Sequence, residues 1–484
     1  MQRLTGKRQR HVAAIPLIGL AACALSACGG GPVPGSLPPA RVAVADGQAP
    51  PAGTASPPAV GAAAPRRAFT LPGALASGTA KVDLYAHDRP GMLSPVVARF
   101  PERIYVPNGE SDTVTMIDPH TYRVLRAVKV GRRPQHVIPS WDLKTLWVSN
   151  DDGDSLTPIN PMTGKAGRPV HVEDPYDLYF TLDGRTALVM AERENRLDFR
   201  DPRTMRLRRS LQVPCRGISH ADFTADGTLL LASCESSGQL VVVDVEARKL
   251  RAVVDLADGT TRRGDLPHAG ERDSGLEHGL RPGLENGPET GLDHGLRSGL
   301  RRHRENGTVG HGAIGHGTVG HGALRHGRMA YGNMPQDVKL SPDGTVFYVA
   351  DMARGGVWLV DARRFRITGF IRTGAGARGL YVSRDSKVLY VSNRAAGSVT
   401  VVSFALRRPI DTWRIPGGGS PDMGGVSADG GRLWLSGRYD GVVYVFDTVS
   451  GHLIRKIDVG AGPRGLTVYP QPGRYSLGHT GIFR

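Results

Sequence analysis

The chain has 484 residues, of which 64 are glycine and 35 are proline, and only 6% are aromatic. This composition favours a fold with many tight turns. The formal net charge is +16. Basic residues neither form an arginine-rich helix nor alternate with aromatic residues, so the sequence gives no support for nucleic acid as a partner. The charge indicates attraction to an anionic cell envelope, or simply an arginine-rich composition.

The first 28 residues have the layout of an export signal. A basic start precedes an apolar stretch over residues 12–24, which is too short to span a bilayer comfortably. The segment Leu25-Ser26-Ala27-Cys28 then resembles the lipobox of bacterial lipoproteins. The resemblance implies a signal peptide over 1–28, lipidation of Cys28, and a lipid-anchored location on the extracytoplasmic face of the cell membrane. A plain secretion signal with a chance cysteine is the alternative.

Residues 29–90 follow as a segment rich in proline, alanine and glycine. Such a composition cannot bury an apolar core, so we expect a disordered tether. It would hold the rest of the chain away from the membrane.

Residues 91–470 contain seven copies of one segment. Each copy has an apolar strand that ends in a small or polar residue, followed by a second apolar strand that ends near an aspartate. The first strands end at Asn108, Asn150, Ala191, Cys234, Asp351, Asn393 and Gly437. The second strands end at Asp118, Asn160, Asp201, Asp244, Asp361, Ser403 and Asp447. Both series advance by 42, 41, 43, 117, 42 and 44 residues, so the period is shared.

This period indicates an all-β fold. About 40–45 residues with four short strands is what one blade of a β-propeller requires. A single four-stranded sheet cannot bury both faces, whereas radial stacking buries each blade against its neighbours. The sequence therefore predicts a seven-bladed β-propeller of four-stranded antiparallel blades.

The end of the repeat region predicts how the ring closes. Residues 460–468 match residues 130–138 and form half of a further repeat. We expect this C-terminal strand to become the innermost strand of the first blade, because an open ring would have two unpaired edges. The alternative is that residues 94–99 fill this place. Residues 471–484 are left as a C-terminal tail.

Residues 257–334 interrupt the repeats as a low-complexity insertion between the fourth and fifth copies. The segment is rich in glycine and contains a five-residue period that places His311, His316, His321 and His326 before glycines. It is expected to be disordered. Histidine-rich tracts bind metal ions weakly, and simple repeat expansion is the alternative explanation.

The innermost strand of each blade faces the central channel of a propeller. The residue fourteen positions before each first-strand end gives His136, Asp177, His220, Asp337, Gly379 and Met423, with Gly465 from the half repeat. Neighbouring positions add Arg378, Asp422 and Arg464. These side chains predict a polar channel mouth that binds a ligand, with His136 and His220 as ligands of a divalent metal. A water-filled polar channel is the alternative.

Two of the four cysteines, Cys215 and Cys234, fall within the repeats and flank one predicted hairpin. Antiparallel pairing would bring them to the same end of that hairpin. A disulfide is then favoured in an oxidising compartment. Two buried free thiols are the alternative.

The strand signatures resemble the YVTN-type β-propeller repeat. They include Tyr105-Val106-Pro107-Asn108, Trp147-Val148-Ser149-Asn150 and Tyr390-Val391-Ser392-Asn393. The resemblance implies relatives among surface-layer and periplasmic propellers, haem d1 domains and lactonases. A haem d1 domain would use His136 or His220 as its axial ligand.

The function is therefore expected at the cell envelope. Motifs such as GxSxG, HExxH or a phosphate-binding glycine loop are missing from the sequence, and no catalytic residue is assigned. The first hypothesis is a non-enzymatic, lipid-anchored module that binds an envelope protein, a glycan or a small ligand. The alternative is an extracytoplasmic enzyme or metal-binding propeller, lactonase-like or haem d1-like, that uses the channel mouth.

Overall fold

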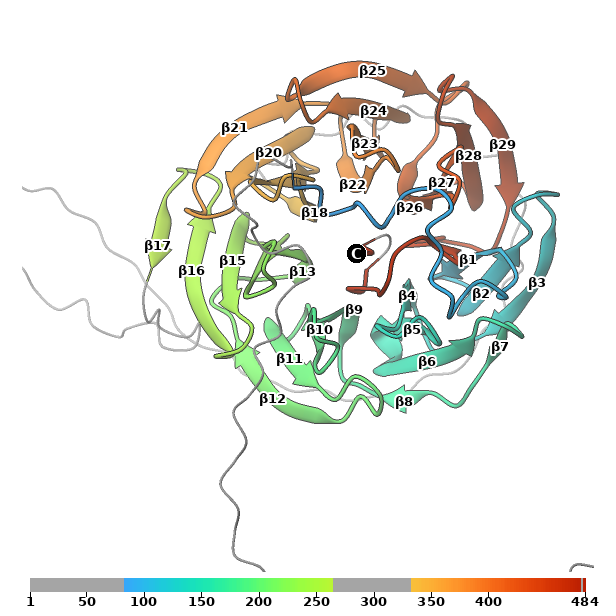
Figure 1. Ribbon diagram of the computed structural model, residues 1–484, viewed down its shortest axis with the longest axis horizontal. Coiled ribbons are helices and arrows are strands. Elements are labelled where there is room, and N and C mark those ends of the chain that lie inside the picture. The colour runs from blue at the N-terminus through green and yellow to red at the C-terminus, as the bar shows by residue number, and fades with distance from the viewer. Residues whose placement is uncertain (1–81, 264–331, 480–481) are drawn as a thin grey trace, which may run out of the picture. The chain divides into compact units, whose positions relative to one another are not determined.

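The computed structural model describes residues 82–263, 332–479 and 482–484. In these residues seven antiparallel sheets are arranged radially around one axis (Figure 1). Each sheet corresponds to one sequence copy, so the prediction of an all-β, seven-bladed propeller is confirmed. The described part of the chain has one short 3-10 helix, η1 (Asp151–Gly153), and none of its helices is long and apolar enough to cross a membrane.

The first four blades follow the sequence copies strand by strand, and their innermost strands surround the axis. From the axis outward, blade one consists of β30 (Thr467–Tyr469), β1 (Arg103–Asn108), β2 (Thr113–Ile117) and β3 (Val124–Lys129). Blade two consists of β4 (Pro134–Pro139), β5 (Leu146–Asn150), β6 (Ser155–Asn160) and β7 (Lys165–Ala166), and β8 (Val170–His171) also pairs with β6. Blade three consists of β9 (Pro175–Phe180), β10 (Ala187–Ala191), β11 (Arg196–Arg200) and β12 (Leu207–Gln212). Blade four consists of β13 (Ile218–Phe223), β14 (Leu229–Cys234), β15 (Gln239–Asp244), β16 (Lys249–Asp255) and β17 (Thr261–Arg263).

The remaining three blades repeat the same order. Blade five consists of β18 (Pro335–Leu340), β19 (Val346–Asp351), β20 (Gly356–Asp361) and β21 (Ile367–Arg372). Blade six consists of β22 (Ala377–Val382), β23 (Val388–Asn393), β24 (Ser398–Ser403) and β25 (Arg408–Arg414). Blade seven consists of β26 (Pro421–Val426), β27 (Arg432–Gly437), β28 (Val442–Asp447) and β29 (Leu453–Asp458).

Blade one is assembled from both ends of the repeat region. Strand β30 pairs antiparallel with β1, with Tyr105 opposite Thr467 and Arg103 opposite Tyr469. Residues 94–99 form no strand. The prediction that the C-terminal half repeat closes the ring is therefore confirmed, and β1 keeps no unpaired inner edge.

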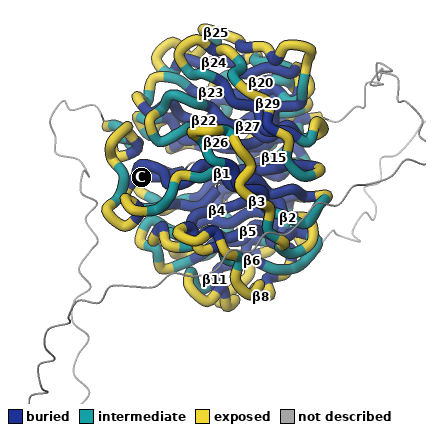
Figure 2. Tube along the Cα trace, turned by 90° about the vertical axis from the view of Figure 1, so that its right-hand side faces the viewer, coloured by how far each residue is buried: buried dark blue, intermediate teal, exposed yellow. Residues whose placement is uncertain are grey.

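The apolar core lies between the blades rather than within one layer. Both faces of a blade pack against neighbours: Val114 of β2 clusters with Val148 of β5, and Ile104 of β1 clusters with Trp434 of β27. In Figure 2 the inner and middle strands are buried and the outer strands are largely exposed. This arrangement explains why middle strands such as β10, β15 and β28 read as nearly continuous apolar runs.

Where the first strand of a copy ends in asparagine, this side chain makes hydrogen bonds inside the blade. The side chain of Asn150 at the end of β5 donates to Thr157 Oγ1 at 2.9 Å and accepts from the Gly131 amide at 3.1 Å. Asn108 and Asn393 likewise donate to threonine hydroxyls on the next strand. At Asn150 the side chain thus joins two strands of the blade to the turn that precedes its innermost strand.

The fourth blade extends into the predicted insertion. Residues 261–263 form β17, which pairs with β16 as a fifth strand, whereas the sequence had placed 257–334 outside the blades. The local pattern was too short to be recognised as a strand. The histidine tract and the remainder of the insertion lie outside the described residues, as do residues 1–28 with Cys28 and most of the predicted tether.

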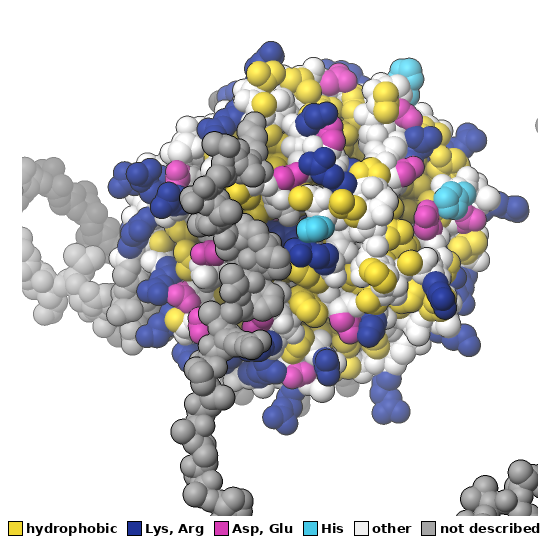
Figure 3. All heavy atoms as spheres, viewed as in Figure 1, with side chains coloured by type: hydrophobic (Ala, Val, Ile, Leu, Met, Phe, Trp, Pro, Cys, Tyr) yellow, Lys and Arg dark blue, Asp and Glu magenta, His cyan; other side chains and the backbone are white. Residues whose placement is uncertain are grey.

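The described end of the predicted tether packs on the propeller. Tyr85 is buried and its hydroxyl donates to the Leu340 carbonyl at 2.9 Å, and Asp88 is also buried. In Figure 1 this segment (blue) crosses the inner strands on one face of the ring. The space-filling view of that face shows basic side chains interspersed with acidic and apolar ones rather than gathered in one patch (Figure 3).

A disulfide joins Cys215 to Cys234, with the two Cα atoms 5.9 Å apart. Cys234 ends β14, and Cys215 lies just before β13, the strand that pairs with β14. The antiparallel ladder thus brings the two ends of the hairpin together, as the spacing of the cysteines required.

Candidate functional site

Four of the predicted channel residues converge at the axis. His136 comes from β4, Asp177 from β9, His220 from β13 and Asp337 from β18, and all four are buried. They occupy the same position in four consecutive blades. The repeat therefore places equivalent side chains side by side around the channel.

An irregularity at the start of each of these strands shapes the site. The β4–β5 ladder shifts register between Pro134 and His136, which takes the His136 amide out of the regular pairing. The hydroxyl of Ser149 accepts a hydrogen bond from that amide at 3.1 Å. In blade four the hydroxyl of Ser233 accepts a hydrogen bond from the His220 amide at 3.2 Å in the same way. The serine of the strand signature thus satisfies a donor that a bulge would leave unpaired.

A fifth polar residue reaches the axis from the C-terminal tail. His479 is fully buried, and its Nδ1 atom lies 2.7 Å from Asp177 Oδ2, while its Nε2 atom lies 3.4 Å from Asp337 Oδ1. Its ring centre is 5.1 Å from the ring centres of both His136 and His220. The sequence analysis treated residues 471–484 only as a tail, because nothing in the repeat period points to His479.

The tail approaches the ring closely enough to require glycine. The His479 amide donates to the Leu178 carbonyl at 3.0 Å, and Gly478 forms a bridge with Tyr179 of β9. Gly478 has φ +96°, and a Cβ atom there would lie 2.2 Å from the Leu178 carbonyl oxygen. Only glycine allows this combination of backbone angle and close contact.

The groups at the axis differ in charge. Burial opposes the charged form of His479, but Asp177 and Asp337 outweigh it and raise its pKa to about 9. Burial lowers the pKa of His136 to about 4 and that of His220 well below its usual value. The centre thus combines two neutral imidazoles with a cation held between two carboxylates.

Four of these residues form a set of donor atoms with the spacing of a metal site. One ligand atom from each of His136, Asp177, His220 and His479 lies within 4.8 Å of every other. We call these four residues the axial cluster. Three imidazoles and one carboxylate are a donor set that suits zinc and related transition metals.

A second group of polar residues lies at the channel mouth. Arg378 and Asp422 are near the start of β22 and β26, and Arg464 precedes β30. Arg394 and Arg438 directly follow β23 and β27. Arg378 Nε lies 2.7 Å from Asp422 Oδ1, and Arg394 Nη1 lies 3.6 Å from Asp422 Oδ2. Burial works against ionised Asp422, but these guanidinium groups, together with those of Arg438 and Arg464, hold its pKa below its usual value. We call the four arginines the arginine rim.

The arginine rim carries more positive charge than its carboxylate can balance. Burial together with Arg438 lowers the pKa of Arg464 to about 9, and burial lowers the pKa of Arg438 although Asp422 opposes the shift. Arg464 also donates to the amide oxygen of Gln135. Such crowding of like charges in a partly buried place is typical of a site for an anion.

The opposite side of the mouth is acidic. Burial and the neighbouring Glu235 raise the pKa of Glu192 to about 9. Asp151 is paired with Arg133 and Arg193 at 3.9 and 3.8 Å. The mouth is therefore polarised, with the arginine rim on blades six, seven and one and the carboxyl groups on blades two to four.

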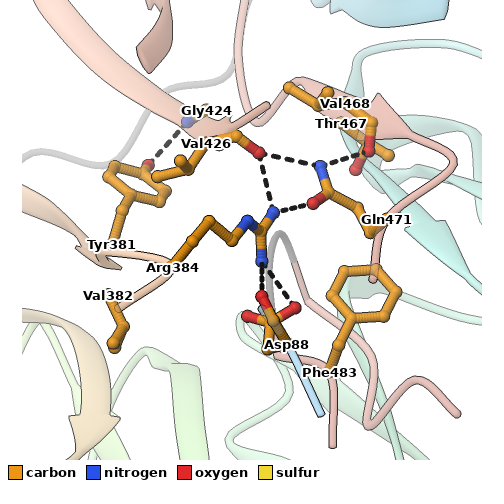
Figure 4. Close-up of a pocket in the computed structure, with 11 residues that line it drawn as sticks. Asp88, Tyr381, Val382, Arg384, Gly424, Val426, Thr467, Val468, Gln471 and Phe483 are labelled. Carbon is orange, nitrogen blue, oxygen red and sulfur yellow. Dashed lines mark hydrogen bonds and ion pairs between the residues drawn. The ribbon is translucent and has the colours of Figure 1, made fainter. Parts of the chain in front are cut away.

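The other end of the channel is closed by both chain segments that flank the repeats. Arg384 forms a 2.5 Å ion pair with Asp88, donates to the Val426 carbonyl at 2.8 Å and bonds Gln471 (Figure 4). These residues line a cavity of about 20 Å³, which is room for roughly one water molecule. Trp141 stacks on Tyr475 of the tail. At this end Arg384 and Trp141 therefore hold the terminal segments against the blades.

The predicted site residues therefore fall into two groups. His136, Asp177, His220 and Asp337 meet at the axis, whereas Arg378, Asp422 and Arg464 lie at the mouth. Sequence reasoning missed His479, Arg394 and Arg438. The last two directly follow the strand ends Asn393 and Gly437, so the period itself held the signal for them.

Comparison with known proteins supports the architecture. A family model described as YNCE-like beta-propeller matches residues 89–261 and 322–473, on both sides of the insertion. A search of curated proteins gives no match.

Solved structures with the same fold have low sequence identity to this chain. A functionally unknown protein from Desulfotomaculum acetoxidans DSM 771 has a TM-score of 0.50 and 13% identity, with 76% of this chain and 98% of that chain covered. The dihydro-haem d1 dehydrogenase NirN has a TM-score of 0.47 and 14% identity, over 78% and 76% of the two chains. Hydrazine synthase from Kuenenia stuttgartiensis has a TM-score of 0.47 and 15% identity, over 73% and 98%. At these identities the likeness extends to the fold alone.

Proposed function

The chain belongs to the YNCE-like β-propeller family, and on this premise we propose that it is a lipid-anchored envelope protein that binds an anionic ligand at its channel mouth. The ligand carries carboxylate groups and is a small molecule or an acidic glycan. Binding, without conversion of the ligand, is the role that the polarised mouth supports best.

The observation that carries this proposal is the surplus of positive charge in the arginine rim. Four guanidinium groups act on one carboxylate, Asp422, which already has ion pairs with Arg378 and Arg394. Guanidinium groups bind carboxylates through two parallel hydrogen bonds. A ligand carboxylate would balance Arg438 and Arg464, whose pKa values are both lowered in its absence.

The direct test is calorimetric titration of the full chain with citrate and, separately, with an acidic oligosaccharide. We expect binding to one or both, weakened as salt rises because the contacts are electrostatic. The double change Arg438→Gln and Arg464→Gln should raise Kd at least about tenfold, since charged hydrogen bonds contribute about 1.5–3 kcal/mol each. Arg408→Gln, at an exposed position on β25, is the control.

Two results would contradict the proposal. One is equal affinity in the double variant and in the Arg408 control. The other is binding of neither anion in a folded protein, with capture of an envelope protein instead, which would move the function to a protein interface.

The anchoring part of the proposal is supported by the disulfide and by the lipobox. The Cys215–Cys234 bridge is typical of an oxidising, extracytoplasmic compartment. We expect Cys28→Ser to move the protein from the membrane fraction to the soluble fraction and to abolish incorporation of labelled fatty acid. Retention of Cys28→Ser in washed membranes would count against lipid anchoring.

A further inference from the structure

The axial cluster lies deeper than the arginine rim and is not needed for binding an anion. We propose that the axial cluster binds one divalent transition-metal ion of the zinc class, with His136, Asp177, His220 and His479 as its ligands. The donor atoms of these residues are already within 4.8 Å of one another. An ion would displace the proton of His479 together with one of its two carboxylate contacts.

Buried imidazole nitrogens without partners give independent support. Nδ1 of His136 and both ring nitrogens of His220 have no hydrogen-bond partner, although both side chains are almost fully buried. Leaving such a group unsatisfied destabilises the fold, because it has lost its hydrogen bonds to water without replacement. Neutral imidazole is a good metal ligand, and a metal ion would satisfy one nitrogen of each ring.

The surroundings of the cluster match those of protein metal sites. Asp177 is held in place by the Tyr179 hydroxyl and by the Leu178 amide, both at 2.8 Å. Asp337 lies 3.4 Å from the second ring nitrogen of His479. Carboxylates and hydroxyls behind the ligands fix their orientation and strengthen binding.

The donor types decide which ion would bind. Three nitrogens and one oxygen favour zinc and its neighbours, because calcium and magnesium prefer sites made of oxygen atoms. The carboxylate of Asp177 offsets part of the ion's charge. A second carboxylate, that of Asp337, lies nearby, and its Oδ1 atom is 4.0 Å from Lys339 Nζ. The pocket therefore suits one small dication.

The ligands come from separate parts of the chain, so a bound ion would affect the stability of the fold. Three ligands come from blades two, three and four, and the fourth comes from the tail. A bound ion would tie the tail to three blades at once. Zinc should then raise the free energy of unfolding, by an amount that grows with the ratio of the free zinc concentration to Kd.

The main competing interpretation is a buried ion-pair network without metal, in which His479 stays protonated between Asp177 and Asp337. The experiment measures metal directly, and the chelator used is an uncharged amine rather than a carboxylate, so its outcome is independent of the arginine rim. The protein is the full chain with every histidine of the insertion changed to alanine, which removes the insertion as a source of bound imidazole metal. These are His268, His278, His294, His303, His311, His316, His321 and His326.

This protein is purified without a metal column, loaded with Zn²⁺, dialysed against a weak chelator and analysed for metal. We expect close to one zinc ion per chain, and intense visible absorption from a tetrahedral site when Co²⁺ replaces zinc. His220→Gln and His479→Gln should each weaken zinc binding at least about 100-fold. His452→Ala, at an exposed position, is the matched control and should leave binding unchanged.

The proposal is overturned if the protein retains no zinc after dialysis, or if either glutamine variant binds zinc as the control does. Circular dichroism reports whether each variant is folded. If a glutamine variant does not fold, the cobalt spectrum of the unchanged axial cluster decides: tetrahedral bands support the site, and the weak octahedral spectrum of loosely held cobalt excludes it.

Discussion

At the scale of single residues, the protein uses small polar side chains to satisfy backbone groups near the channel. Ser392 of β23 accepts the Gly379 amide at 2.9 Å and donates to the Asp422 carbonyl at 2.6 Å. One hydroxyl thus joins blade six to the neighbouring blade seven. Ser149 links blades two and three in the same way, whereas Ser233 and Ser436 accept the equivalent amide but donate within their own blades.

We predict that Ser392→Ala lowers the free energy of unfolding by about 1–3 kcal/mol, because it leaves a buried amide without an acceptor. The measurement is urea denaturation followed by tryptophan fluorescence. Ser450→Ala removes an exposed hydroxyl that bonds Asp447 and should change stability by less than about 0.5 kcal/mol. Equal losses in the two variants would contradict the role assigned to the buried serine.

The carboxyl groups at the mouth predict a pH dependence. Burial and Glu235 raise the pKa of Glu192 from 4.5 to about 9. The folded state therefore keeps a proton that the unfolded chain releases as pH rises between these values. Glu192 should therefore make the free energy of unfolding fall with increasing pH over this range, and its own contribution is at most about 1.4 kcal/mol per unit.

Glu192→Gln carries a neutral group at every pH, so this decline should become shallower in the variant. The measurement compares urea denaturation of the two proteins at pH 5, 7 and 9. Glu246→Gln, at an exposed position of blade four, should keep the slope of the unchanged protein. A slope that is the same in all three proteins would show that Glu192 titrates normally.

At the scale of elements, the C-terminal tail completes the site. It packs against β9, and residues 474–477 pair with 482–484, for example through the Leu477 amide and the Ile482 carbonyl at 3.0 Å. This pairing carries His479 into the axis. The position of one histidine therefore depends on the path of a whole segment that lies outside the repeats.

We predict that Gly478→Ala displaces the tail, because the new Cβ would lie 2.2 Å from the Leu178 carbonyl oxygen. Gly417→Ala is the matched control: it also has a positive φ, +78°, but no atom lies within 4 Å of the added carbon. Both changes should cost roughly 1–3 kcal/mol in backbone strain. Only Gly478→Ala should also expose the amides of residues 476–479 to hydrogen exchange. Unchanged protection of these amides would mean that the contact is readily relieved.

At the scale of the whole molecule, the ring depends on closure between its ends. Strand β30 completes blade one, and the closing face is braced by Arg384, which binds both Asp88 and Gln471. The N-terminal and C-terminal segments are thus fixed to the same blades. A closed ring of this kind has no exposed inner edge that could pair with another chain.

We predict that two truncations differ sharply. A chain ending at residue 473 keeps β30 and should remain a folded monomer with a lower Tm, since the tail is lost. A chain ending at residue 458 lacks β30, leaves β1 unpaired and should aggregate or unfold without a cooperative transition. Size-exclusion chromatography and thermal circular dichroism measure both properties. Cooperative unfolding of the shorter chain at the same Tm would contradict closure by β30.

The sequence by itself determined the architecture. A shared period of two markers predicted seven blades, the half repeat at 460–468 predicted the closing strand, and counting back from the strand ends found His136, Asp177, His220 and Asp337. Such features are local and repeated, so each copy confirms the others. Arg394 and Arg438 also follow the period, because each stands directly after the end of a first strand.

Only the tertiary structure decided how these residues are grouped. In the structure the axial cluster and the arginine rim are two separate groups. The sequence could not separate them, because their residues occupy neighbouring positions of the repeat. The structure also brought in His479, Asp88 and Gln471 from segments that have no repeat. A single copy of a residue in an irregular segment has no period to locate it, and its place follows from packing contacts that form only when the ring has closed.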